Sequence, residues 1–162
     1  MDRSANPHVL RLRPVGAFDA AARSAYRAHL GRLDPAARGR RFGAGVSDAG
    51  LDQHAATWAP AQAWALVDHQ GRWRGVVEVF DTAAGSAEAA LSIEADWRGM
   101  GWGRRMLDKA CAWCATHGIA QVECTLASHN PSMRQLAASS GAVRRAGPWT
   151  GWEVWAWSTA AA

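Results

Sequence analysis

The stretch that decides the fold is residues 93–105, which read Ile-Glu-Ala-Asp-Trp-Arg-Gly-Met-Gly-Trp-Gly-Arg-Arg. It follows a predicted strand at residues 87–95 and opens residues 101–117, where apolar side chains recur at helical spacing. Alternating glycines let a backbone turn tightly and approach a ligand. The first N–H groups of a helix lack internal acceptors and carry partial positive charge. We therefore expect a phosphate cradle to which Arg98, Arg104 and Arg105 add charge; a glycine-rich connection without a ligand is the plainer alternative.

The spacing of the glycines narrows the choice of phosphate ligand. A nucleoside-triphosphate loop requires Gly-x-x-x-x-Gly-Lys-Ser/Thr, which the sequence does not contain. A dinucleotide site requires Gly-x-Gly-x-x-Gly near the start of a larger doubly wound sheet, whereas here Gly99, Gly101 and Gly103 alternate. Glu123 keeps the dinucleotide alternative open, because it follows the glycines by about 20 residues, where an acid binds a ribose in that fold.

Apolar periodicity and turn residues predict an alternation of strands and helices around this loop. Strands are expected at residues 8–15, 61–68, 73–81, 87–95, 121–126, 142–145 and 151–158, and helices at 20–30, 35–41, 49–58, 101–117 and 130–140. This order predicts an α/β fold with a mixed sheet. Parallel strands should flank a right-handed crossover within 87–126. We expect one domain, residues 1–162, with an ordered core at 8–158, a loop at Thr82–Ser86 and a frayed tail at Ala160–Ala162.

Residues 98–103, Arg-Gly-Met-Gly-Trp-Gly, resemble the Arg/Gln-x-x-Gly-x-Gly/Ala signature of the GCN5-related N-acetyltransferase (GNAT) superfamily. Residues 130–136, Asn-Pro-Ser-Met-Arg-Gln-Leu, resemble the family's second half, in which an asparagine opens a helix. Residues 33–42, 47–51 and 88–97 resemble segments of bacterial protein-lysine acetyltransferases. The resemblance implies a GNAT-like domain with a mixed, mostly antiparallel, twisted sheet of about six to seven strands and helices on both faces.

The same resemblance implies an acetyl-CoA-dependent N-acetyltransferase that acts on a primary amine, of a protein lysine or a small molecule, by direct attack in a ternary complex. Acetyl-CoA is then the cosubstrate, and no metal is expected. In the superfamily the signature loop holds the pyrophosphate and the preceding strand contacts the pantetheine arm. The implied contacts in this chain are Ile93, Glu94 and Ala95 for pantetheine, Asn130 near the thiol, and Arg98, Gly99, Met100, Gly101, Trp102, Gly103 and Arg104 for the pyrophosphate.

The sequence departs from many family members at the expected general acid. The tyrosine that they carry seven residues after the asparagine is Ala137 here, and the one tyrosine, Tyr26, lies in the first predicted helix. The protein-lysine group also lacks this tyrosine and relies on a strand glutamate, which implies Glu88 as the catalytic residue. Glu94 is expected to face solvent or cap the loop, and His129 is a second candidate for proton transfer. A non-catalytic acyl-CoA-binding regulatory module on the same fold is the alternative function, because Ala137 removes the usual acid.

The cysteines and tryptophans have structural interpretations beside functional ones. Cys111 and Cys114 form a CxxC late in a helix, without the partners of a zinc site or the helix N-terminus of a redox site, so we expect free packing thiols. Ten tryptophans crowd the sequence, and Trp155 and Trp157 share one face of the last strand. They are expected to fill the core or a dimer interface, or to form an aromatic wall for a cationic amine.

Charge and composition limit the partners and the location. The formal net charge is +4, but basic residues are spread along the chain, so we expect no nucleic-acid partner. No run of 18 apolar residues predicts a membrane helix, and the first residues lack the apolar core of a signal peptide. The chain is therefore expected to be cytoplasmic, without a membrane partner, as a monomer or homodimer.

Overall fold

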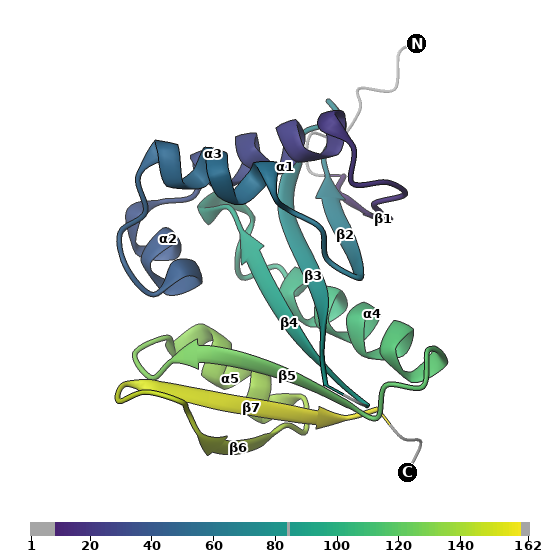
Figure 1. Ribbon diagram of the computed structural model, residues 1–162, viewed down its shortest axis with the longest axis vertical. Helices are drawn as coiled ribbons and strands as arrows, with labels where there is room; N and C mark the ends of the chain where they lie inside the picture. Colours follow the sequence, from purple (N-terminus) through teal and green to yellow (C-terminus); the bar gives the residue numbers. More distant parts are fainter. Residues whose placement is uncertain (1–8, 84, 160–162) are drawn as a thin grey trace.

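The computed structural model describes residues 9–83 and 85–159, whose strands form one sheet in the order β1-β2-β3-β4-β5-β7-β6 (Figure 1). The strands are β1 (Arg11–Pro14), β2 (Gln62–Val67), β3 (Trp73–Ala83), β4 (Ser86–Ile93), β5 (Gln121–Ala127), β6 (Val143–Ala146) and β7 (Trp152–Ser158). Each neighbouring pair is antiparallel except β4 and β5, which are parallel. The predicted α/β domain with a mixed, mostly antiparallel sheet is confirmed.

Helices cover both faces of the sheet, as predicted (Figure 1). They are α1 (Ala20–Arg32), α2 (Pro35–Phe42), α3 (Asp48–Ala56), α4 (Trp102–Thr116) and α5 (Pro131–Ser139). One core joins α1 and α3 to one face of β2 and β3, and includes Tyr26, Leu30, Leu51, Trp58 and Val76. A second core joins α4 and α5 to the opposite face, and includes Trp64, Val77, Met106, Leu107 and Trp157. Burial of this apolar surface on both faces is the main force that holds the domain together.

Four of the five described α-helices begin at a side chain that caps their first turn. Asp19, Asp34, Ser47 and Asn130 each accept a hydrogen bond from the backbone N–H three residues later. Such caps satisfy donors that have no partner within the helix. The helix α4 is the exception, because it begins at Gly101 and has no side-chain cap. Its first N–H groups therefore remain available to a ligand.

The parallel strands β4 and β5 pair over only a short segment. Ser86, Ala87 and Glu88 pair with residues 121–123, and the described structure shows no pairing between the strands beyond this point. Further along, β4 continues to pair with β3, whereas β5 continues to pair with β7. The two strands diverge in Figure 1, and an opening is left in the middle of the sheet.

Some predicted boundaries are corrected. The strand expected at residues 87–95 ends at Ile93, because Ala95–Trp97 form the 3₁₀ turn η1. The loop expected at Thr82–Ser86 is shorter, because β3 runs to Ala83 and β4 begins at Ser86. His8, in the first predicted strand and at the start of the expected core, and the tail at 160–162 lie outside the described residues. Within the described chain, no helix is long and apolar enough to span a membrane.

Candidate active site

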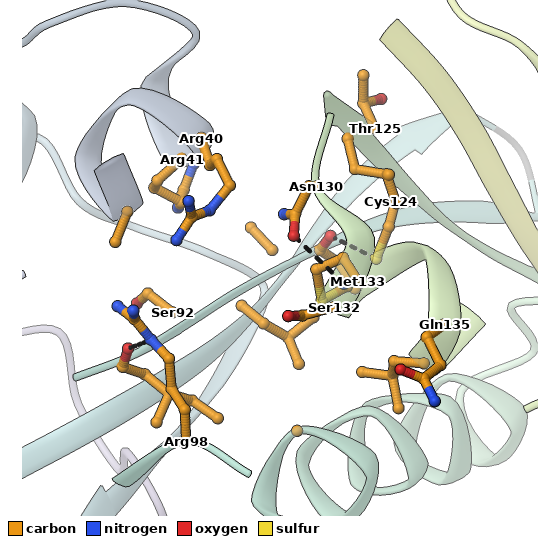
Figure 2. A pocket seen from close by; sticks show the side chains of 18 of the residues that line it. Arg40, Arg41, Ser92, Arg98, Cys124, Thr125, Asn130, Ser132, Met133 and Gln135 are labelled. Carbon is orange, nitrogen blue, oxygen red and sulfur yellow. Dashed lines mark hydrogen bonds between the residues drawn. The ribbon is translucent and has the colours of Figure 1, made fainter. Parts of the chain in front are cut away.

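A cleft of about 1090 Å³ lies where β4 and β5 separate, and Figure 2 shows its lining. The end of α2 forms one side, with Arg40 and Arg41, while the start of α5 forms another, with Asn130 and Met133. Glu88 and Ile93 of β4, residues 124–126 of β5 and the loop before α4 add to the lining. The loop contributes Arg98, Gly99 and Gly101, and the first turn of α4 contributes Gly103 and Arg104. Of the predicted contacts, Glu94, Ala95, Met100 and Trp102 are not part of the lining.

The glycine loop has a backbone conformation that favours glycine. Gly99 has a φ of 74° and Gly101 a φ of 79°, in the left-handed region that other residues rarely adopt. A Cβ at either position would contact nothing within 4 Å, so the requirement comes from the backbone and not from crowding. Gly103 differs, because a Cβ there would lie 3.4 Å from Leu136 Cδ2 of α5. The loop thus turns the start of α4 toward the cleft and places it close to α5.

The two flanking arginines are held by acidic residues. Arg98 donates from Nε to the Ile93 carbonyl at 2.8 Å and from a terminal nitrogen to Asp34 Oδ2 at 2.7 Å. The Ala37 backbone N–H, assisted by Arg98, lowers the pKa of Asp34 below its ordinary value. Arg104 pairs with Asp108 one turn along α4 at 2.8 Å. Arg98 therefore ties the loop to the N-terminus of α2, and the α4 backbone supplies the donors that have no protein partner.

Glu94 is placed differently from the expectation that it faces solvent. Its side chain is only 9% exposed and contacts His29, Arg32 and Arg74 at 2.9 to 3.2 Å. Burial acts to raise the pKa of Glu94, but the hydrogen bonds from His29, Arg74 and Arg32 outweigh it, so the pKa lies below its ordinary value. Its backbone N–H donates to the Arg74 carbonyl. Glu94 anchors α1 to the end of β4, and Ser92 joins the same network through His29 at 2.8 Å.

Two other predicted loop contacts also lie away from the cleft. Met100 is 53% exposed, and the ring of Trp102 lies beneath the Arg105 guanidinium at 4.9 Å. Asn130 lies in the cleft, but its side-chain oxygen already accepts from the Met133 N–H to cap α5. The amide nitrogen of Asn130 has no hydrogen bond within the described residues and can donate to a ligand.

Glu88 lies at the closed end of the opening between the strands. It is half-buried, lines the cleft and belongs to the short segment where β4 still pairs with β5. The register with β3 is unbroken from Gly75 to Asp81, so Glu88 and Ser92 share the sheet face of Glu78. Ala137 is fully buried in α5. The structure thus brings Glu88, Asn130 and the glycine loop to one cleft.

Sequence reasoning missed the buried carboxylate of Glu78, which holds Arg41 on the α2 wall of the cleft. Its Oε1 accepts from the Tyr26 hydroxyl and the Trp58 indole N–H, each at 2.6 Å, and its Oε2 accepts from Arg41 at 2.9 Å. The Tyr26 hydroxyl also lies 3.1 Å from His54 Nε2. Glu78 is the lone acid of the apolar run 76–79. An acid in such a run indicates a buried charge that needs a partner, so the network could have been suspected from the sequence.

Burial and neighbouring charges shift the pKa values of the groups around Glu78. Burial, assisted by the charge of Glu78, raises the pKa of Tyr26 well above its ordinary value, so the phenol stays neutral. Burial disfavours the charge of Arg41, but the Glu78 carboxylate outweighs it and raises the pKa of Arg41. Burial lowers the pKa of His54, and the positive charge of Arg41 lowers it further. An Arg41–Glu78 ion pair therefore sits under the cleft, supported by a neutral tyrosine.

The cysteines, His129 and most of the tryptophans lie where they support the fold or lie outside the cleft. Cys111, Cys114 and Cys124 are free, and burial raises the pKa of Cys111 and of Cys114 to about 11. His129 is exposed and outside the lining. Trp155 and Trp157 are buried in the core, as one interpretation predicted. The tryptophans that line the cleft are Trp149 and Trp152, which precede and begin β7.

A sheet that opens between two parallel strands, beside a helix that begins at an uncapped glycine, defines an acetyltransferase fold of the GNAT type. The sequence profile of the acetyltransferase (GNAT) family matches residues 38–142, which is more than half of the chain. The chain therefore belongs to this family of N-acetyltransferases. No curated protein sequence matches it.

Solved structures agree with the family at low sequence identity. The GNAT domain of PAT from S. lividans is 15% identical with a TM-score of 0.77, covering 92% of this chain and 90% of that one. Spermidine N-acetyltransferase from Vibrio cholerae, in complex with CoA and spermine, is 17% identical with a TM-score of 0.70. The match covers 93% of this chain and 95% of that one. Ribosomal-protein-S5-alanine acetyltransferase from Vibrio fischeri is 12% identical with a TM-score of 0.72, covering 93% of each chain. At these identities the similarity establishes the fold and leaves the acceptor to be argued from the site.

Proposed function

We propose that this protein transfers the acetyl group of acetyl-CoA to a primary amine by direct attack in a ternary complex. The observation that carries the proposal is the uncapped N-terminus of α4 at the cleft between β4 and β5. A helix N-terminus attracts anions through its free N–H groups and its dipole. The pyrophosphate of acetyl-CoA would lie against Gly99, Gly101 and Gly103, with Arg98 and Arg104 at its sides.

The pantetheine arm would run along the free edge of β4. The Ala89 carbonyl accepts from Cys124 Sγ of β5, and the Ile93 carbonyl accepts from Arg98, so both point away from β3. The N–H and C=O of a strand residue point to the same side, and the side alternates along the strand. Residues 89, 91 and 93 therefore direct backbone groups into the cleft. An N–H of residue 89 or 91 is suited to hold the oxyanion of the attacked thioester.

Acetyl transfer needs a neutral amine. A lysine-like amine with a pKa of about 10.4 costs about 4.6 kcal/mol to neutralise at pH 7. We assign the proton to Glu88, the one carboxylate of the described lining. Glu88 takes the ammonium proton and passes it to solvent. The neutral nitrogen then attacks the thioester carbonyl, the C–N bond forms, Glu88 takes the second proton from nitrogen and the C–S bond breaks. CoA leaves as the thiolate and takes a proton from water, because Ala137 supplies no acid.

A non-catalytic acyl-CoA-binding module remains the second candidate, because Ala137 stands where many family members carry an acid. Incubation with acetyl-CoA and a panel of amines, with CoA release followed by a thiol reagent and products by mass spectrometry, separates the two. We expect CoA release that depends on an amine and equals the N-acetylated product. Tight acetyl-CoA binding without amine-dependent release, across protein lysines, polyamines and amino acids, would establish the binding module instead.

A further inference from the structure

The side of the cleft formed by α2 and Glu88, which we take as the acceptor side, carries two cations outside the glycine loop. Arg40 and Arg41 line the cleft from α2, across the opening from Asn130 and Met133 (Figure 2). The cradle for the pyrophosphate lies instead at the start of α4, with Arg98 and Arg104. Among the described lining residues, Glu88 is the single acid. Outside the glycine loop and the first turn of α4, the lining therefore carries two arginines and one carboxylate, and Arg41 is also paired with the buried Glu78.

Arg41 is held in place by one hydrogen bond and has a further donor without a partner in the described structure. One terminal nitrogen donates to Glu78 Oε2 at 2.9 Å, and the side chain is 16% exposed. Its Nε is buried and has no hydrogen-bond partner among the described residues. A guanidinium has five N–H donors, and the hydrogen bond to Glu78 accounts for one of those on Arg41. An unsatisfied buried donor in a folded protein usually indicates a missing partner.

Arg40 adds a second charge to this wall, and that charge helps to lower the pKa of Asp34 at the start of the same helix. Arg40 is half-buried, lines the cleft and makes no hydrogen bond or ion pair with the part of the chain that is described. The helix that carries it is held firmly, because Arg98 bonds its cap Asp34, and Arg38 bonds the carbonyls of residues 31 and 33. The two arginines are thus presented to the cleft by an anchored helix.

We propose that Arg40 and Arg41 form an anion subsite and that the acceptor is a small amine that carries a carboxylate, an amino acid. The proposal rests on the proposed function and names the substrate class of that same site. The amine meets Glu88, while the carboxylate takes charge-assisted hydrogen bonds from α2, which packs against β4. A polyamine would place a second cation beside Arg40, which like-charge repulsion disfavours.

Binding to the complex with CoA tests the subsite without any requirement for turnover. Isothermal titration compares each of several L-amino acids with its decarboxylated amine, for example phenylalanine with phenethylamine. Hydrogen bonds to charged groups predict that the amino acid binds about 10- to 100-fold more tightly. In Arg40→Gln this preference should fall by about 10-fold, and Arg13→Gln, an exposed cation on β1, should retain it. Equal binding of the decarboxylated amines, or no binding of any amino acid, overturns the proposal.

Arg41 needs a compensated variant, because Arg41→Gln alone leaves Glu78 buried without its cation. Arg41→Gln with Glu78→Gln removes both charges and should also reduce the preference for the carboxylate. Acetylation assays on the same pairs keep this proposal separate from the proposed function. Selective amino-acid binding without acetyl transfer supports the anion subsite and contradicts the enzyme. Acetylation of a lysine peptide or spermidine, with amino acids neither bound nor acetylated, supports the enzyme and overturns the subsite.

Discussion

The two sides of the cleft are built in different ways. The proposed cofactor side is a short contiguous stretch, residues 98–104, in which Gly99 and Gly101 have positive φ angles. The acceptor side depends on side chains far apart in sequence, with Arg41 of α2 held by Glu78 of β3. A backbone site therefore tolerates variation around its glycines, whereas a side-chain site depends on buried partners. The variants below perturb one side at a time.

The largest expected effect is on the acceptor side, in Glu88→Gln. The substitution keeps the size of the side chain but removes the base, and loss of a general base typically costs about 100- to 10,000-fold in rate. We expect turnover at pH 7 to fall by that amount, with little change in acetyl-CoA affinity. The deficit should shrink as the pH rises, because more of the amine is then neutral. A pH–rate profile checks this, and Glu123→Gln on β5 is the control; wild-type turnover in Glu88→Gln across the range would make Glu88 structural.

Glu78→Gln tests whether buried partners hold the acceptor side together. It leaves the Arg41 charge without its counter-ion, and a broken buried pair costs about 3–5 kcal/mol. Urea unfolding followed by tryptophan fluorescence should report that loss. Asp108→Asn, which removes the partner of Arg104 at the surface, should cost less than about 1 kcal/mol. If both variants lose the same small amount, the Glu78 network does not hold this wall.

Gly101→Val tests the cofactor side, with Gly118→Val as a matched control at the other end of α4. Gly101 has a φ of 79° and Gly118 a φ of 73°, and a Cβ at either meets nothing within 4 Å. Both variants should therefore lose similar stability through strain of about 1–3 kcal/mol. Relaxation of that strain should move the cradle at Gly101 but not at Gly118. We therefore expect only Gly101→Val to weaken the binding of acetyl-CoA, by about 10- to 100-fold in isothermal titration. Equal affinities of the two variants for acetyl-CoA would contradict binding of the cofactor at the α4 N-terminus.

The smallest effect on activity is expected for the paired change Cys111→Ala with Cys114→Ala. Burial raises the pKa of each thiol to about 11, so neither is a thiolate at neutral pH. Loss of packing should reduce the free energy of unfolding by roughly 1–3 kcal/mol. Turnover per folded molecule should stay near that of the wild type. A selective loss of turnover at unchanged stability would reveal chemistry on α4 that neither side of the cleft explains.

The same contrast explains what the sequence could predict. Local patterns predicted the glycine loop, the helices near residues 20–30 and 49–58 and the parallel strands around α4, and the structure has all three features. The placement of Glu94 was wrong, because its partners His29, Arg32 and Arg74 come from elements distant in sequence.

The acceptor side was harder still to predict. No spacing rule connects Glu78 with Tyr26, Trp58 and Arg41, which meet only when α1 and α2 pack on the sheet. A lone acid inside an apolar strand was the one sign of this network, because a buried charge requires a partner. Its partner could not be chosen from the sequence.

Stabilisation by ligand tests the central claim most directly, that acetyl-CoA binds at the α4 N-terminus in this cleft. Urea unfolding of the wild type is measured alone, with acetyl-CoA at about 100 times its dissociation constant, and with NAD. Ligand that binds only the folded state should add about 2.7 kcal/mol to the free energy of unfolding. The account predicts this gain with acetyl-CoA, no gain with NAD, and a smaller gain in Gly101→Val at the same concentration. No gain with millimolar acetyl-CoA, together with a gain from NAD, would contradict it.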